Sequence, residues 1–281
     1  MSEQVSPLEK LAETVPSLPD VVTVLDRELK KPDCSPSSVE CVINTDGALS
    51  ARLLKIANSS FYGFASRIET ISQALTMIGL AQLRDLVVSA SVMRIFQGIN
   101  IKGFSMESYW RHSVATGICA RQIATQRGET NLEPYFVTGL LHDIGRLVVF
   151  KNLPAKSDQA IKLAETKRIS VIEAENEIFR FNHADLACRI MKNWKLPPRI
   201  YDVVENHHKP TQTSGFYTET IILHVADLIT NLMKIGDSGE VIINAAIPKD
   251  AVIFKDLDFE LTQLIEEVEH LSREACDNFL I

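Results

Sequence analysis

Apolar residues recur every three to four positions along almost the whole chain, and sustained alternation of apolar with polar residues is missing. The first half shows the pattern clearly. Asp46 is a typical helix N-cap residue, and Leu49 and Leu53 follow it on one face. Thr70 begins a similar segment, and a longer apolar helix is expected from Leu80 to Phe96. The pattern predicts an all-α fold.

The same periodicity continues through the second half of the chain, interrupted by short polar or glycine-containing segments. Gly98, Asn100 and Gly103 mark a boundary, so we expect an N-terminal helical subdomain over 1–104 and a helical bundle over 105–281. The bundle is expected to end in an amphipathic helix that contains Leu261, Leu264 and Val268. Its other predicted helices span 106–127, 134–151, 156–168, 171–181, 183–195, 198–208 and 217–234.

Several helix ends carry recognisable sequence markers. Ser170 and Glu173 have the spacing of a capping box. Pro134 and Pro198 suit the first turns of helices, and Gly128 suits a C-terminal stop.

Composition narrows the function classes. Hydrophobic residues make up 46% of the 281 residues, enough for a substantial core, and a net charge of −7 disfavours broad binding to nucleic acid. The five cysteines are widely spaced and never form a C-x-x-C pair, which is typical of a reducing compartment. Without an apolar leader or a continuous membrane-length stretch, the chain is expected to be cytoplasmic and independent of membranes.

Six of the seven histidines fall between residues 112 and 224, mostly on the apolar faces of predicted helices. Taken singly, such a histidine is more often a hydrogen-bonded core residue than a metal ligand. His142 and Asp143, however, interrupt the most apolar predicted helix, where a buried carboxylate needs a compensating charge. Because several helices each direct an imidazole or carboxylate inward, we expect a shared metal site. The six histidines are His112, His142, His183, His207, His208 and His224.

Asp227 shares a helix face with His224, three residues earlier. We expect His224 to orient a metal ligand instead of binding metal itself. His270, in the C-terminal amphipathic helix, is expected to be exposed.

The segment GLLHDIGRLVVF, from Gly139 to Phe150, resembles the signature of the HD superfamily of metal-dependent phosphohydrolases. Four further segments resemble its HDOD branch. They are SLPDVV (17–22), INTDGALSARLLKIANSSFYG (43–63), ISQALTMIGL (71–80) and SYWRHSVATG (108–117). The resemblance implies an HD-type helical bundle with an N-terminal helical subdomain.

The resemblance also implies a metal centre. HD enzymes hold one divalent ion with the residues that match His112, His142, Asp143 and Asp227. Members with a second ion, such as the HD-GYP phosphodiesterases, use three more histidines, with the aspartate of the His-Asp pair bridging the ions. The matching histidines here are His183, His207 and His208. The expected cofactors are two divalent ions of Fe, Mn, Zn or Ni.

Two departures bear on catalysis. The Gly-Tyr-Pro element of the HD-GYP branch is replaced by KPTQTSGFYTE, residues 209–219, so no cyclic-dinucleotide specificity carries over. Arg146 stands where a lysine is common and is either a phosphate clamp in catalysis with Asp143 or a structural ion-pair partner. In the HDOD-like loop, Asn58 and Tyr62 are expected to fix local structure instead of touching substrate.

Two function classes therefore stand side by side. The chain is either a metal-dependent phosphohydrolase or phosphodiesterase acting on a phosphorylated small molecule or nucleotide, or a non-catalytic bacterial signalling scaffold. The scaffold would have a structural or vestigial metal site and would bind a signalling protein. Nucleic-acid binding is disfavoured, because Arg52, Lys55, Arg67 and Arg84 make a sparse basic face.

Overall fold

The computed structural model describes residues 6–59, 61–211, 215–240 and 261–279. The protein is all-α, as the periodicity predicts. Every regular element in these ranges is a helix, and one isolated bridge joins Ile101 to Phe104.

The chain divides into two compact units. The larger unit comprises Met1–Pro16 and Asn100–Val268, and the smaller unit comprises Ser17–Ile99 and Glu269–Ile281. The expected division into 1–104 and 105–281 therefore differs from the structure in two ways. The internal boundary falls a few residues earlier, and each terminal segment belongs to the other unit.

Helix α1 (Pro7–Glu13) explains why the N-terminal segment belongs to the larger unit. It begins with a capping box between Ser6 and Glu9, and it packs against α12 in the larger unit. Arg189 donates a hydrogen bond to Glu9 over 2.8 Å, and the Trp194 indole donates to the Pro16 carbonyl over 2.9 Å. Periodicity alone could not assign α1, because its partners lie about 180 residues away in sequence.

The smaller unit contains a run of short helices with caps where the sequence predicts them. Asp46 accepts a hydrogen bond from the Leu49 backbone, and Thr70 forms a capping box with Gln73. No single helix in the described part of the chain is long and apolar enough to span a membrane; α5 and α6 reach that length only together, across a bend of 119°. The helices are α2 (Asp20–Glu28), α3 (Pro36–Ile43), α4 (Gly47–Ala57), α5 (Ile71–Ile78) and α6 (Leu80–Ile95).

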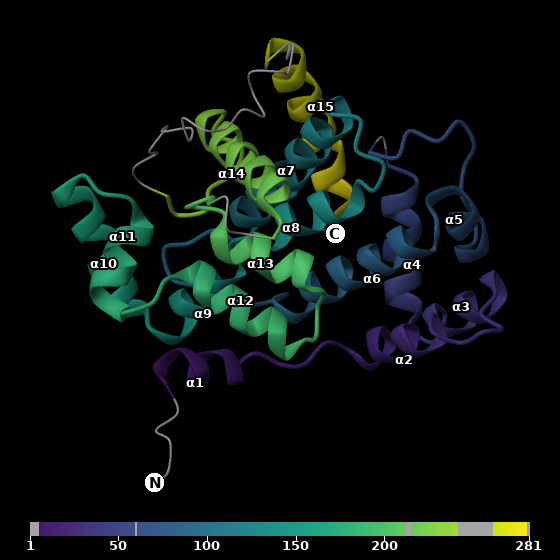
Figure 1. Cartoon of the computed structure of the whole chain (residues 1–281), viewed down its shortest axis with the longest axis horizontal. Coiled ribbons are helices and arrows are strands. Elements are labelled where there is room, and N and C mark those ends of the chain that lie inside the picture. Colours follow the sequence, from purple (N-terminus) through teal and green to yellow (C-terminus); the bar gives the residue numbers. More distant parts are fainter. Residues whose placement is uncertain (1–5, 60, 212–214, 241–260, 280–281) are drawn as a thin grey trace, which may run out of the picture. The chain divides into compact units, whose positions relative to one another are not determined.

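The larger unit is built around α7, which packs against both α8 and α14 (Figure 1). The capping box at Ser170 is confirmed, as are the first-turn positions of Pro134 and Pro198. Gly128 ends the turn after α7 at a φ of 75°. The helices are α7 (Met106–Gln126), α8 (Glu133–Leu141), α9 (Ile144–Asn152), α10 (Pro154–Lys167), α11 (Val171–Phe179), α12 (His183–Asn193), α13 (Pro198–Asn206) and α14 (Tyr217–Leu232). The C-terminal amphipathic helix is α15 (Leu261–Phe279).

The single helix predicted over 134–151 is wrong. The structure breaks it into α8 and α9, with His142 and Asp143 between them; Asp143 has φ −103° and ψ 9°. In a continuous helix, neighbouring side chains diverge by about 100° around the axis. The break changes that relation, and both side chains are buried. Both flanking segments are apolar, so the periodicity gave no sign of the turn.

Three glycines allow the elements around His142 and Asp143 to approach closely. A Cβ on Gly139 of α8 would lie 2.4 Å from the Cα of Gly117 in α7. One on Gly145 of α9 would lie 2.0 Å from the His183 carbonyl oxygen, and one on Gly236 would lie 2.4 Å from the His112 nitrogen. Larger residues would force these backbones apart, so the glycines help to set the positions of the histidines.

Candidate metal centre

Three side chains from three helical segments form a first group. His112 lies in α7, His142 at the end of α8 and Asp227 in α14. The Asp227 Oδ1 atom is 3.0 Å from the Nε2 atom of His112 and 3.4 Å from that of His142. Both histidines are buried, while Asp227 retains 14% side-chain exposure. We call these three residues the triad.

Four side chains form a second group, which we call the tetrad: Asp143, His183, His207 and His208. The His183 Nε2 atom is 3.1 Å from Asp143 Oδ1 and 2.8 Å from the Nε2 atom of His208. His183 begins α12, and the other two histidines directly follow α13. Within each group, the potential ligand atoms all lie within 4.8 Å of one another.

Asp143 links the two groups. Its Oδ2 atom is 3.3 Å from His142 Nε2 in the triad, while its Oδ1 atom is 3.1 Å from His183 Nε2 in the tetrad. The rings of His142 and His207 also approach to 5.2 Å between centroids. The structure thus brings together all seven residues predicted as metal ligands, and Asp143 contacts a histidine of each group.

Three histidines are held by the nitrogen that faces away from the centre. Nδ1 of His142 donates to the Gly139 carbonyl over 2.7 Å, and Nδ1 of His207 donates to the Val204 carbonyl over 2.6 Å. The equivalent atom of His183 donates to Glu175 over 2.6 Å. Because these acceptors fix the proton on Nδ1, each Nε2 lone pair is free to bind a metal ion.

The electrostatics of the centre reflect deep burial of opposite charges. Burial lowers the pKa of His142, but the carboxylates of Asp143 and Asp227 outweigh burial and raise that pKa to about 10. Burial and the charge on His142 lower the pKa of His207 to about 3. Burial raises the pKa of Asp143, yet Arg146 and the histidines hold it well below its usual range. The neutral imidazole of His207 and the ionised carboxylate of Asp143 are forms that bind metal ions, whereas His142 would have to lose its proton to a bound cation.

The Arg146 guanidinium is buried beside Asp143, with 1% of its side chain exposed. Its Nε atom lies 3.2 Å from Asp143 Oδ1, and Nη2 donates to Glu240 over 2.8 Å. Glu240 also accepts a hydrogen bond from the Val171 backbone at the start of α11. Of the two roles open for Arg146, these contacts describe the structural ion pair, because the side chain already has two carboxylate partners.

His224 lies outside both groups. Its Nδ1 atom donates to the His207 carbonyl over 2.8 Å, so His224 supports the backbone of a tetrad member. This contact agrees with the expectation that His224 orients a ligand, and the residue that it supports is His207.

Two supporting residues escaped the sequence reasoning. Glu175 accepts hydrogen bonds from both the backbone and the ring of His183, and Asn231 donates to Asp227 over 2.8 Å. Glu175 had a signal, because it shares an apolar helix face with Ile172 and Phe179. Asn231 had none beyond its position one turn after Asp227.

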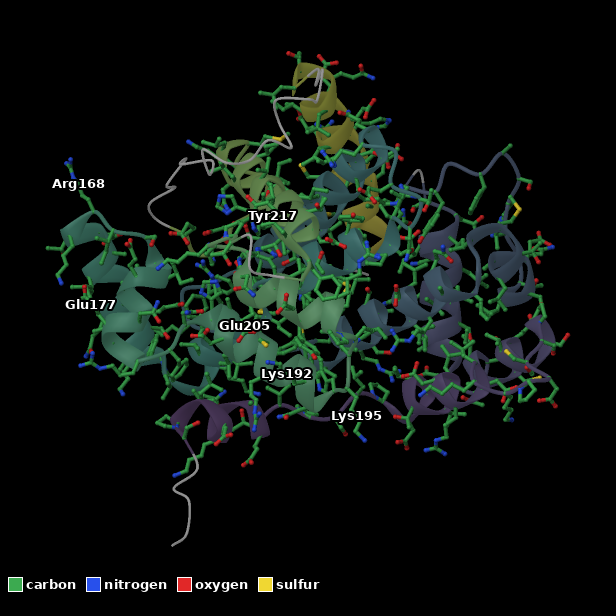
Figure 2. All side chains as sticks on the ribbon, viewed as in Figure 1. Arg168, Glu177, Lys192, Lys195, Glu205 and Tyr217 are labelled. Carbon is green, nitrogen blue, oxygen red and sulfur yellow. The ribbon has the colours of Figure 1, made fainter. Side chains whose placement is uncertain are left out.

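The donor set suits divalent transition metals. Five imidazoles and two carboxylates meet in two adjoining groups, and the Nε2 atoms of His142 and His207 are buried without a hydrogen-bond partner. Unpaired buried polar atoms are costly, and a cation at each group would satisfy them. The outer surfaces of the same helices carry exposed charged residues. Lys192 of α12 and Glu205 of α13 point outward (Figure 2) and form an ion pair with 3.8 Å between nitrogen and oxygen.

The fold and the centre together define an all-helical, HD-type protein with a histidine and aspartate cluster suited to divalent metal binding. The HDOD domain matches residues 15–210 of the chain. The chain belongs to the HDOD family. Asp227 and His224 lie beyond the matched range, so their place in the centre rests on the structure.

Solved structures share this fold. An HDOD domain protein of Geobacter sulfurreducens superposes with a TM-score of 0.76 at 24% identity, covering 97% of this chain and 98% of that one. A protein of Shewanella amazonensis, named as a candidate phosphohydrolase, gives 0.75 at 22% identity over 98% and 99%. An uncharacterized protein of Treponema pallidum is 26% identical over 195 residues, which cover 69% of this chain and 37% of that protein.

Proposed function

We propose that this HDOD protein binds two divalent metal ions, one at the triad and one at the tetrad, and uses them in a metal-dependent phosphohydrolase or phosphodiesterase reaction within bacterial signalling. Asp143 would contribute to both ions. The expected substrate is a phosphorylated small molecule or nucleotide. Fe, Mn, Zn and Ni all suit this mixture of imidazole and carboxylate ligands.

The observation that carries the proposal is the orientation of the histidines. His142, His183 and His207 each use Nδ1 to reach a fixed acceptor and direct Nε2 toward the centre. A core histidine would need a hydrogen-bond partner at both nitrogens, whereas a metal ligand needs a partner only at the outer one. Bound divalent ions supply Lewis-acid chemistry of the kind that hydrolyses phosphate esters.

The residues of the chain have defined parts in this function. The triad and tetrad hold the ions, Glu175 fixes the ring of His183, and Arg146 balances the charge of Asp143. Asp227 and His208 are the less buried ligands, which favours approach of substrate from their side of the centre.

A non-catalytic signalling scaffold is the second candidate, in which the metal site is structural or vestigial and a signalling protein is the partner. The burial of Arg146 favours it, because the guanidinium is already paired with Asp143 and Glu240 and 1% of the side chain is exposed. The enzyme requires bound metal, whereas the scaffold requires it only if the site is structural, and the two candidates differ in turnover.

Metal analysis of protein purified without chelator or added metal tests whether the centre binds metal. We expect about two equivalents per chain. His207→Ala should lower the metal content, while His270→Ala, which alters an exposed histidine, should not. Less than about 0.2 equivalents in the unaltered chain would contradict the metal centre.

Hydrolysis of bis(p-nitrophenyl) phosphate by metal-loaded protein then separates the candidates. The enzyme proposal expects turnover that requires metal and disappears in His207→Ala but persists in His270→Ala. Full metal occupancy without turnover of this ester or of a nucleotide panel would favour the scaffold. In that case a pull-down with the metal-loaded chain should retain a protein partner that the metal-free chain releases.

A further inference from the structure

A cavity of about 280 Å³ lies on the larger unit, beside the first two turns of α10. One part of its wall is apolar and includes the rings of Phe104 and Phe150 and the side chain of Ile161. The two rings meet edge to face, with 5.0 Å between their centroids. Phe150 is buried, whereas Phe104 and Ile161 are half-buried. The wall therefore offers an apolar surface to a small ligand.

The polar part of the wall is acidic. Asp158, Asp237 and Glu240 supply three carboxylates, and Lys102 is the only cationic side chain among the described residues of the lining. Glu240 is paired with Arg146 over 2.8 Å. Asp158 and Asp237 form no ion pair within the described part of the chain. Two unpaired carboxylates and one ammonium group leave the cavity with a net negative charge.

Ser157 adds a buried acceptor to the same wall. Its side chain is 4% exposed, and its hydroxyl donates to the Leu153 carbonyl one turn earlier over 3.0 Å. Because its proton is used there, the Ser157 oxygen can offer only a lone pair to a ligand. With Asp158 and Asp237, the cavity has three acceptors, which match the three donors of a primary ammonium group.

The charge distribution along the chain also favours a cation. The net charge is −7, and residues 17–99 contain eight acidic and eight basic side chains, so the excess negative charge lies outside that segment. The cavity belongs to the acidic remainder of the chain, which attracts cations.

Hydrogen bonds hold the acidic wall in place without a ligand. The Asp237 backbone donates to the Ser108 carbonyl over 3.1 Å, and the Asp237 carboxylate accepts from the Gly239 backbone over 2.7 Å. Glu240 is fixed by its ion pair with the buried Arg146. A wall that is ordered beforehand favours binding, because the ligand need not order it.

We propose that this cavity binds a small organic cation, a primary amine attached to an aromatic ring. The ammonium group donates to Asp158, Asp237 and Ser157, and the ring packs against the two phenylalanines. Hydrogen bonds between an ammonium and a carboxylate are strengthened by charge, and aromatic rings pack favourably edge to face or offset. The site shares no residue with the triad or the tetrad and does not depend on the function proposed for them.

Isothermal titration calorimetry of the full chain with tryptamine tests the site. Three comparison ligands each remove one feature: ethylamine lacks the ring, indole propionate has a carboxylate in place of the ammonium, and trimethylated tryptamine keeps the charge without an N–H donor. We expect saturable tryptamine binding with a Kd below about 1 mM, within reach of a ligand of this size. Each comparison ligand should bind at least about fivefold more weakly.

Asp158→Asn tests the acidic wall. It should weaken tryptamine binding about threefold to fivefold, the range for a solvent-exposed charge pair. Because Asp158 has no ion pair with the protein, its replacement should leave folding intact. Glu165→Gln, which alters an exposed acid of α10 outside the cavity, is the matched control and should leave the affinity unchanged. Lys102→Gln should strengthen binding about twofold, because it removes a like charge.

Ile161→Ala tests the apolar wall. It should weaken tryptamine binding about fivefold while leaving the affinity for ethylamine unchanged, because it removes only apolar contact area. Leu163→Ala, which alters a half-buried leucine of α10 outside the cavity, is the matched control. Circular dichroism checks the folding of each variant. If Ile161→Ala fails to fold, Phe104→Leu carries the same prediction.

The proposal is overturned if tryptamine shows no saturable binding below about 1 mM, or if Asp158→Asn and Glu165→Gln have equal affinities. Indole propionate that binds as tightly as tryptamine would overturn the assignment of a cation, and so would weaker tryptamine binding in Lys102→Gln. Equal affinities for ethylamine and tryptamine would overturn the aromatic part of the ligand, and equal affinities for tryptamine and its trimethylated form would overturn the primary amine.

Discussion

The two units differ in how many ionisable side chains they bury. Among the described residues, the smaller unit buries one acidic, basic or histidine side chain, Glu28, which pairs with Lys31 at the surface. The larger unit buries eight: His112, Glu133, His142, Asp143, Arg146, Glu175, His183 and His207. Seven of these eight belong to the metal centre or contact it directly, and Glu133 is the exception.

The smaller unit shows that this chain can build helical cores from apolar residues with few buried charges. Burying a charge costs free energy unless partners compensate for it, so the fold alone gives no reason to gather so many at one place. The concentration in the larger unit is therefore a property of the site. Variants in both units can test how strongly each depends on its polar groups.

Asp143→Ala should have the largest effect. It removes the carboxylate that faces Arg146, His142 and His183, and breaking such a buried ion pair costs about 3–5 kcal/mol. Urea denaturation of chelator-treated protein measures this loss, and metal analysis should show depletion at both groups. Asp158→Ala, an exposed change in α10, is the control. Equal stability of the two variants would contradict the structural role of the buried charges.

Gly145→Ala should have the second-largest effect. Its added Cβ would lie 2.0 Å from the His183 carbonyl oxygen, so α9 and α12 must separate, at a cost of about 1–3 kcal/mol or more. The metal affinity of the tetrad should fall as His183 moves. In the smaller unit, Gly47→Ala adds a Cβ that meets nothing within 4 Å and should not destabilise the protein. A Gly145→Ala protein with unchanged melting and metal content would argue against close packing at this contact.

Glu175→Gln should act on metal binding more than on folding. It replaces the charged acceptor of the His183 ring with a neutral one of the same shape, and comparable changes weaken metal binding about 10- to 100-fold. Competition with a chromogenic chelator measures the affinity. Glu177→Gln, two residues away at the surface of α11 (Figure 2), should change nothing measurable. Equal metal affinities of the two variants would show that Glu175 does not support metal binding.

Arg84→Gln in the smaller unit should have the smallest effect. Arg84 pairs with Asp26 over 2.8 Å, but Asp26 keeps 35% side-chain exposure, and such partly exposed pairs contribute at most about 1 kcal/mol. Metal content should not change, and urea denaturation should give a small shift. A loss as large as that of Asp143→Ala would break the contrast between the two units.

The sequence predicts the helical class and most helix ends because caps and periodicity are local properties. The inward positions of several histidines indicate a shared site, and the resemblance to the HD signature names the seven residues that the structure brings together there. Long-range pairings, in contrast, cannot be predicted from local patterns. The contact of Arg146 with Glu240 spans 94 residues, and no local pattern encodes it. The break between α8 and α9 was hidden for another reason: apolar residues lie nearly all round that segment, so its periodicity carries little directional information.

That break has a further consequence for how the centre can change. His142 and Asp143 belong to different groups yet are neighbours in the chain, with Cα atoms about 3.8 Å apart by covalent geometry. The other ligands reach the centre through helix packing, which can shift with substitutions in the core. The separation of the two groups is thus anchored by one peptide unit that side-chain mutations elsewhere cannot stretch. An inserted residue between His142 and Asp143 would directly alter the distance between the triad and the tetrad, even with every one of their side chains retained.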